Sequence, residues 1–279
     1  MNTEKRIRNE ARLLLSKGNW SKSVAVFFIL FAAVLLMLFL QSVLVLGIDI
    51  AASPVVESLS AISPEFSLAD EESMGSAIVM MLSGTGSLIA IALGFLLIFP
   101  LYCGAKRFFY LLSKGEDAGI HEVFYYLAYK LKNVMAFTLR YGLLCAVKLL
   151  PCMAPAYLLF AYTFSIEDLS TAVNSLLVVA IFATGIGGLV LWILWTSRQF
   201  LSMYLFIEND NLPAGEYAKI SVRILNGNLN RSVRKLVFSF GGWFLLGLTG
   251  VGLIYFVPYF EAAAATSAKW MIKLDEEVQ

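Results

Sequence analysis

Long uncharged apolar blocks are the feature that most constrains what this chain can fold into. Segments such as 24–46 and 171–197 each run for more than 20 residues without a charged side chain. A helix needs roughly 20 apolar residues to cross a hydrocarbon core about 30 Å thick. Because lipid offers no partner to backbone amides, spanning segments must be helices or closed barrels, and barrel strands would be alternating segments of about ten residues. The uninterrupted Leu, Val, Phe and Ala runs therefore predict transmembrane helices.

The composition supports the same fold class. Hydrophobic residues make up 59% of the 279 residues, charged residues only 15%, and the mean hydropathy is +0.77. A soluble domain of this length would not be so apolar. We expect one all-α integral membrane domain over 1–279, a polytopic bundle of transmembrane helices with amphipathic helices at the cytoplasmic interface.

Six spans account for the apolar blocks, and five spans are the alternative. The six lie at about 24–46, 78–103, 141–164, 171–197, 234–250 and 252–271. In the alternative, the last apolar stretch forms one span ending at Pro258, followed by an interfacial helix. Amphipathic segments are expected on the cytoplasmic side at 3–17, 105–133 and 213–227. The acidic stretch 50–75, which has no Lys or Arg, is expected to be an extracytoplasmic loop.

The distribution of Lys and Arg predicts the orientation in the cell membrane. With six spans, every basic residue except Arg140 and Lys148 falls on the side of the two termini, and an excess of basic residues marks the cytoplasmic side. Such a face attracts anionic lipid headgroups. The expected headgroup contacts are Lys106, Arg107, Arg198, Arg231, Arg234 and Lys235. No motif for binding nucleic acid is visible, so we expect no nucleic-acid partner.

Three charges at or inside the apolar blocks are candidates for function. Arg140 opens the third span, Lys148 lies within it, and Glu261 lies in the sixth. Charges inside a membrane are unfavourable and mark functional sites by default. Arg140 and Lys148 could instead extend to the cytoplasmic headgroups. Glu261 could pair with Lys148, take up a proton or line a polar path.

The groups needed for catalysis or metal binding are scarce. Cys103, Cys145 and Cys152 have no CxxC spacing, so they indicate neither a disulfide framework nor a metal site. His121 is the only histidine, and a lone histidine makes Ser-His or Cys-His catalysis hard to assemble. Phosphate-loop and dinucleotide fingerprints are missing too. We expect no enzyme activity and no cofactor.

The cytoplasmic segments share a weak internal similarity. Leu15 to Trp20, Leu131 to Asn133 and Leu225 to Asn228 each place a Gly or Asn helix stop before an apolar run. The chain therefore reads as three helical hairpins, either by triplication or by chance.

Several of these residues resemble a family of bacterial multi-pass membrane proteins known as domain of unknown function 975. The likeness covers Ala11-Arg12 to Trp20, Gly104 to Glu116, and Ser221 to Gly227 with Gly242-Trp243 and Pro258-Tyr259. The family's usual Lys-rich joint is replaced here by Asn228-Leu229-Asn230-Arg231, so the chain resembles a divergent member. The resemblance implies a membrane protein of Gram-positive-type bacteria without an assigned activity.

Three classes of function remain open. The lack of catalytic groups favours a non-enzymatic membrane protein, acting as a scaffold, a partner subunit or an envelope-homeostasis factor. A transporter or channel for a small solute or lipid is the alternative, supported by Lys148, Glu261 and the prolines of the third span. A lipid-modifying enzyme is the third, and no group of residues supports it. Small residues spaced four apart permit self-association with another copy or a membrane partner.

Overall fold

The computed structural model describes residues 3–62, 94–164, 171–247 and 249–278. Over these ranges the chain forms helices and no strand, which confirms the predicted all-α fold. Among the described residues, five helices are long and apolar enough to cross a membrane, namely Trp20–Ile48, Gly94–Lys114, Leu131–Thr163, Ser175–Glu208 and Val251–Glu277. The multi-pass membrane character expected from the apolar blocks is therefore supported. Of the predicted span 78–103, only the part from Gly94 onward lies within the described residues.

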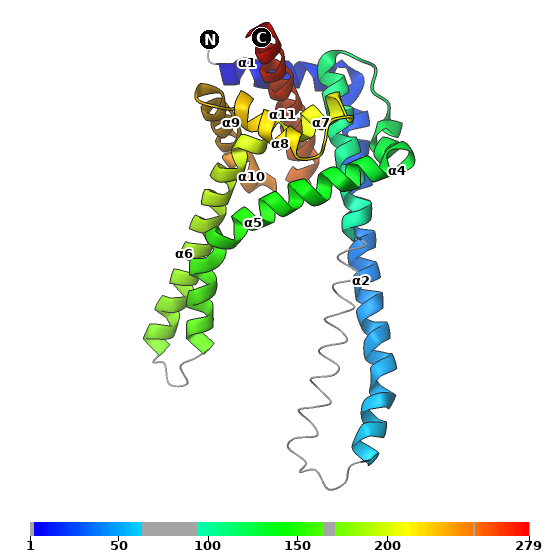
Figure 1. Ribbon diagram of the computed structural model, residues 1–279, viewed down its shortest axis with the longest axis vertical. Coiled ribbons are helices and arrows are strands. Elements are labelled where there is room, and N and C mark those ends of the chain that lie inside the picture. The colour runs from blue at the N-terminus through cyan, green and yellow to red at the C-terminus, as the bar shows by residue number, and fades with distance from the viewer. Residues whose placement is uncertain (1–2, 63–93, 165–170, 248, 279) are drawn as a thin grey trace.

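The helices are arranged as a cap from which two apolar legs project (Figure 1). We define the cap as the end of the Gly94–Lys114 helix together with α1 (Thr3–Leu14), η2 (Ile120–Phe124), α4 (Tyr125–Tyr129), α7 (Ser202–Glu208), α8 (Glu216–Ile224), α9 (Asn228–Ser239), α10 (Gly241–Gly247) and α11 (Val251–Val278). The first leg is α2 (Trp20–Ile62). The second leg is a hairpin of α5 (Leu131–Phe164) and α6 (Thr171–Thr196). Both chain termini lie on the cap (Figure 1).

The first leg is joined to the cap through a short irregular turn. α1 leads into η1 (Leu15–Asn19), a single π-helical turn, and α2 follows directly. Gly18 has a φ of 81°, a left-handed conformation that residues with a Cβ rarely adopt. The same holds for Gly227 at the start of α9, where φ is 77°. Two of the three predicted joints thus contain a glycine in the conformation that stops a helix.

The second leg bends where its prolines lie. α5 first crosses beneath the cap and then turns to run beside α6 (Figure 1). Pro151 and Pro155 lie within α5, and a proline removes a helical hydrogen bond and crowds the preceding turn. α6 approaches closely at this point, since a Cβ on Gly188 would lie 2.3 Å from the carbonyl oxygen of Cys152. The two prolines predicted to kink the third span therefore lie within α5, close to where it packs against α6.

The centre of the cap is α11, which packs against α1 and the Gly94–Lys114 helix. Residues 262–268 of α11 are all buried, and most of them are alanines. Such small side chains let neighbouring helices approach closely. The indole nitrogen of Trp270 donates to Glu10 at 3.0 Å, and Lys269 donates to the carbonyl oxygen of Ser113 at 2.6 Å. α11 therefore holds α1 and the Gly94–Lys114 helix together.

An aromatic cluster forms the other side of the cap core. The rings of Phe137 and Phe206 stack with centroids 4.6 Å apart and only 6° between their planes. Tyr126 stacks on Phe206 at 5.3 Å, and Tyr217 meets both phenylalanines edge-on. Aromatic pairs of this kind stabilise by about 0.5–1.5 kcal/mol beyond their buried area. The cluster joins α4, α5, α7 and α8.

Two predicted segments look different in the structure. The expected span 234–250 is divided between α9 and α10, because α9 is amphipathic and buries Val233 and Leu236 against the cap. The expected extracytoplasmic loop 50–75 begins as helix, since α2 continues to Ile62. The rest of that loop lies outside the described residues. The expected amphipathic segments 3–17 and 213–227 contain α1 and α8, and 105–133 contains η2 and α4.

Candidate functional site

The most unusual polar group in the fold is a buried ion pair between Lys106 and Glu261. Lys106 lies on the Gly94–Lys114 helix and Glu261 on α11, at the start of the small-residue run. Their side chains are only 9% and 12% exposed, and Lys106 Nζ lies 2.6 Å from Glu261 Oε2. Charges withdrawn from water this far are strongly unfavourable unless they are paired. Each residue therefore needs the other.

Tyrosines enclose the lysine of this pair. Lys106 Nζ lies 3.4 Å from the hydroxyl oxygen of Tyr204. It also lies 5.3 Å from the ring centre of Tyr102 and 5.4 Å from that of Tyr204. Both distances fall within the range of cation–π attraction. Because the two tyrosines surround the ammonium group and Glu261 neutralises its charge, we interpret the pair as a structural contact between two helices.

A second polar group joins the end of the Gly94–Lys114 helix to the end of α7. The Tyr110 hydroxyl donates to Glu208 Oε2, and Lys114 Nζ lies 2.5 Å from Glu208 Oε1. Tyr110 follows Lys106 by one helical turn, as Glu208 follows Tyr204. The contacts Lys106–Tyr204 and Tyr110–Glu208 therefore show that the Gly94–Lys114 helix and α7 lie side by side and run parallel. The sequence analysis did not identify this group.

The structure separates the three intramembrane charges that were singled out from the sequence. Glu261 pairs with Lys106, so Lys148 is not its partner. Lys148 Nζ instead lies over the ring of Trp195, 5.9 Å from its centre. The guanidinium group of Arg140 lies against Gly215, where an added Cβ would come within 2.8 Å of it. These residues do not converge on one site.

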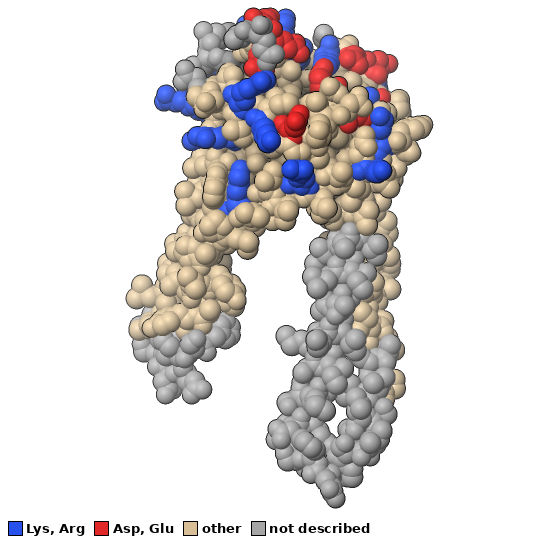
Figure 2. All heavy atoms as spheres, in the orientation of Figure 1, with Lys and Arg blue, Asp and Glu red and all other residues tan. Residues whose placement is uncertain are grey.

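The basic residues expected to touch lipid headgroups also divide into groups. Lys106 is buried in its ion pair and is not available to a headgroup, which corrects that expectation. Arg107 binds Glu122 at 2.7 Å and stacks over the ring of Tyr125 at 4.1 Å. Exposed side chains remain at Arg198, Arg231 and Lys235, and Arg234 is half-buried. Figure 2 shows Lys and Arg gathered on the cap and where it joins the legs.

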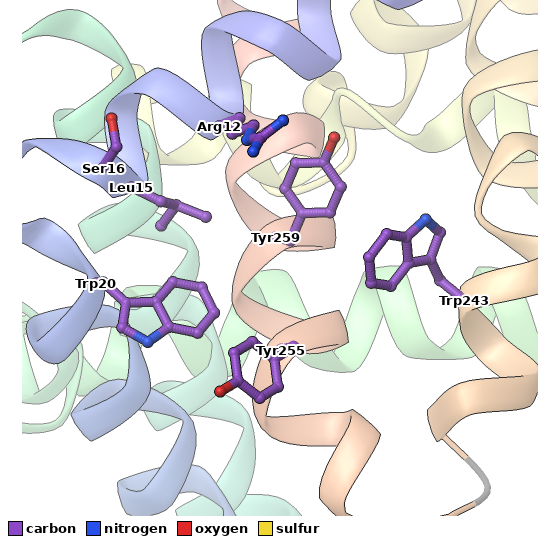
Figure 3. Close-up of a pocket in the computed structure, with 7 residues that line it drawn as sticks. All are labelled: Arg12, Leu15, Ser16, Trp20, Trp243, Tyr255 and Tyr259. Atoms are coloured by element: carbon purple, nitrogen blue, oxygen red, sulfur yellow. The ribbon is translucent and has the colours of Figure 1, made fainter.

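An aromatic cavity lies between the cap and the first leg, and sequence reasoning did not identify it. The cavity measures about 480 Å³ and lies between α1, the start of α2, α10 and α11 (Figure 3). It is lined by Arg12, Leu15, Ser16, Trp20, Trp243, Tyr255 and Tyr259. The only sequence signal was the presence of Trp20 and Trp243 near the beginnings of apolar runs.

Stacked rings form the walls of this cavity. Trp20 stacks on Tyr255 with ring centres 5.2 Å apart, and Trp243 meets Tyr259 edge-on at 5.9 Å. The Tyr259 hydroxyl is 3.4 Å from the carbonyl oxygen of Arg8, which attaches it to α1. In Figure 3 the side chain of Arg12 lies beside Tyr259, at the α1 side of the cavity. Arg12 forms no ion pair with any described acidic residue.

The described residues offer little for metal or redox chemistry. They contain no group of three or more His, Cys, Asp or Glu side chains placed to hold a metal ion. The three cysteines are free, and Cys103 is completely buried. The His121 side chain is 81% exposed at the start of η2 and lies 3.5 Å from Glu122. The described residues thus form an aromatic cavity and two polar groups that join helices.

Comparisons of this chain with protein-family models, with curated proteins and with solved structures find no match. The resemblance to the family of unknown function 975 therefore remains a prediction from the residues that carry it.

Proposed function

We propose that this chain is a non-enzymatic protein of the cell membrane whose cap lies in the cytoplasm with both termini. In this role it is a scaffold or partner subunit that holds another membrane-embedded helix against its legs. The observation that carries the proposal is the separation of charge from apolar surface. The ion pairs of the described residues lie in the cap or where it joins the legs, while 149–164 and 171–196 of the second leg contain no charged residue.

The legs present large apolar faces that none of the described residues covers. Leu150 on α5 is 71% exposed and Phe182 on α6 is 68% exposed. In the most apolar stretch of each of these two helices, only 6% of the residues are buried. The two legs also diverge from each other below the cap (Figure 1). Lipid or a second protein must cover these faces, and helices of another copy or of a partner would pack there.

The alternative of a transporter has less support. A solute pathway needs polar groups facing a cavity within the membrane. Glu261 is neutralised by Lys106 in the cap, and Lys148 lies over Trp195. The second leg supplies no charged side chain below Lys148 in its described residues. The arrangement thus favours contact with other apolar helices over passage of a polar solute.

Photo-crosslinking on the second leg tests the proposal. A photoreactive benzoylphenylalanine in place of Phe182 is expected to form protein adducts of discrete mass in intact cells. The matched control carries the same group in place of Tyr129, which is 78% exposed on the cap. A second, differently tagged copy in the same cells identifies an adduct between two copies of this chain.

Two results would refute the scaffold role. One is that position 182 forms adducts with lipid alone. The other is solute flux in reconstituted vesicles that exceeds the flux of empty vesicles and is lost on Lys148→Met, since this would support the transporter.

A further inference from the structure

The aromatic cavity lies where a membrane surface would meet the protein. Trp20 is the first residue of α2, and the charge-free block of that helix begins at Val24. Trp and Tyr are enriched at membrane–water interfaces, because their rings are amphipathic. Trp243 is 42% exposed and Tyr255 is 56% exposed, so two walls of the cavity remain open to the surroundings. The cavity is therefore accessible from the level of the lipid headgroups.

The charge at the cavity favours an anion. Among the described residues that line the cavity, Arg12 alone is charged. Its guanidinium group has no acidic partner among the described residues, and Arg8 precedes it by one turn of α1. Arginine is the preferred side chain for phosphate, since its planar fork can donate two parallel hydrogen bonds. A cationic ligand would be repelled by this group.

The rest of the lining favours an amphipathic ligand over a free ion. Four of the seven lining residues are Trp or Tyr, and Leu15 adds further apolar surface. Pockets of about 300–1,000 Å³ are typical for small-molecule ligands, so about 480 Å³ can hold a headgroup with its glycerol. Below the cavity, α2 carries exposed Phe28, Phe31 and Leu35, which offer apolar surface to acyl chains.

We propose that this cavity binds the phosphate headgroup of an anionic phospholipid. The guanidinium group of Arg12 contacts the phosphate, and the rings of Trp20, Trp243 and Tyr255 pack against the glycerol and the first methylene groups. The inference requires only that the cap lies at a membrane surface. It does not depend on the scaffold role, and its test is separate from crosslinking on the second leg.

Fluorescence quenching by brominated lipid provides the test, because two tryptophans line the cavity. The purified full-length protein in detergent is titrated with phosphatidylglycerol carrying brominated chains, and with the matching phosphatidylcholine. Saturable quenching is expected at lower concentrations of phosphatidylglycerol. Arg12→Gln is expected to weaken this binding about 10- to 100-fold, which corresponds to the loss of a hydrogen bond to a charged group.

Matched variants separate a specific site from general charge attraction. Lys219→Gln removes one positive charge from the exposed surface of α8 and should leave the binding unchanged. Arg12→Lys keeps the charge without the planar fork and should give intermediate affinity. It also allows the test to proceed if Arg12→Gln does not fold. Trp243→Leu should weaken lipid binding because it removes one wall of the cavity.

Three outcomes would overturn the proposal. Equal affinity for the two lipids would show ordinary boundary lipid. Equal weakening by Lys219→Gln and Arg12→Gln would show diffuse attraction. Free glycerol phosphate that binds as tightly as phosphatidylglycerol would show a site for a soluble phosphate compound.

Discussion

Removal of one partner of the Lys106–Glu261 pair should destabilise the cap. The pair is largely withdrawn from water, with Nζ and Oε2 2.6 Å apart. Glu261→Met would leave the ammonium group of Lys106 with only the Tyr204 hydroxyl, at 3.4 Å, and the faces of two tyrosine rings. Breaking a buried pair in this way costs about 3–5 kcal/mol. Lys106→Met should have a similar effect, because it strands the carboxylate.

The double variant is the decisive measurement. Replacing both charges with methionine removes the pair without leaving either charge unpaired, and such replacements are often neutral or even stabilising. Each kcal/mol corresponds to about 2–4 °C in Tm for a domain of 150–250 residues, so each single variant should lose about 6–20 °C. The double variant should recover most of that loss. Lys219→Met on the exposed surface of α8 serves as the control and should change stability by less than about 0.5 kcal/mol.

Cys103 supplies a reporter within the same region. It is fully buried one helical turn before Lys106, so a thiol-reactive dye can label it only after the cap opens. Cys145→Ala and Cys152→Ala would make it the only thiol, and its labelling on heating would give the Tm. A single variant with the Tm of the parent, or a double variant no more stable than the single variants, would refute the reasoning.

Two other positions give independent tests, both by thermal unfolding. Gly104→Ala should destabilise the cap by about 1–3 kcal/mol, since the new Cβ would lie 2.0 Å from the backbone carbonyl oxygen of Val123. Gly185→Ala on α6 has open space around it and should not destabilise the protein, because alanine favours a helix over glycine by up to about 1 kcal/mol. Asp117 accepts a hydrogen bond from Lys22 at 2.9 Å, which holds the pKa of Asp117 below its ordinary value of 3.8. The stabilisation from this contact is therefore present above pH 3.8 and is lost as the pH falls through the lowered pKa. The Tm difference between the parent and Asp117→Asn should shrink in acid and stay constant from pH 5 to 8.

The apolar pattern predicted the secondary structure better than it predicted the packing. The charge-free blocks of α2 and α6 identified long apolar helices, because hydrocarbon thickness sets a minimum length that composition alone reveals. The prolines of α5 marked its bend, and Gly18 marked the turn before α2. Each of these signals is local, so a single stretch of sequence contains it.

The buried ion pair could not be found in this way. Lys106 and Glu261 are far apart in the chain. The sequence offers Lys148 as only one of three possibilities for Glu261, beside protonation and a polar path. The alanine-rich run after Glu261 reads equally well as a membrane helix or as the centre of a packed cap, since small apolar side chains suit both. The packing of α11 against α1 is a tertiary contact between distant parts of the chain, so a single stretch of sequence does not contain it.

The length of α2 has a mechanical consequence. At 1.5 Å per residue, its 43 residues form a rod about 65 Å long, roughly twice the thickness of the hydrocarbon core. When this rod stands upright in a bilayer, its far end must extend well beyond the opposite headgroups. A force that tilts the far end would then move the near end at Trp20, where one wall of the aromatic cavity is attached. In that orientation the first leg would act on this wall as a lever.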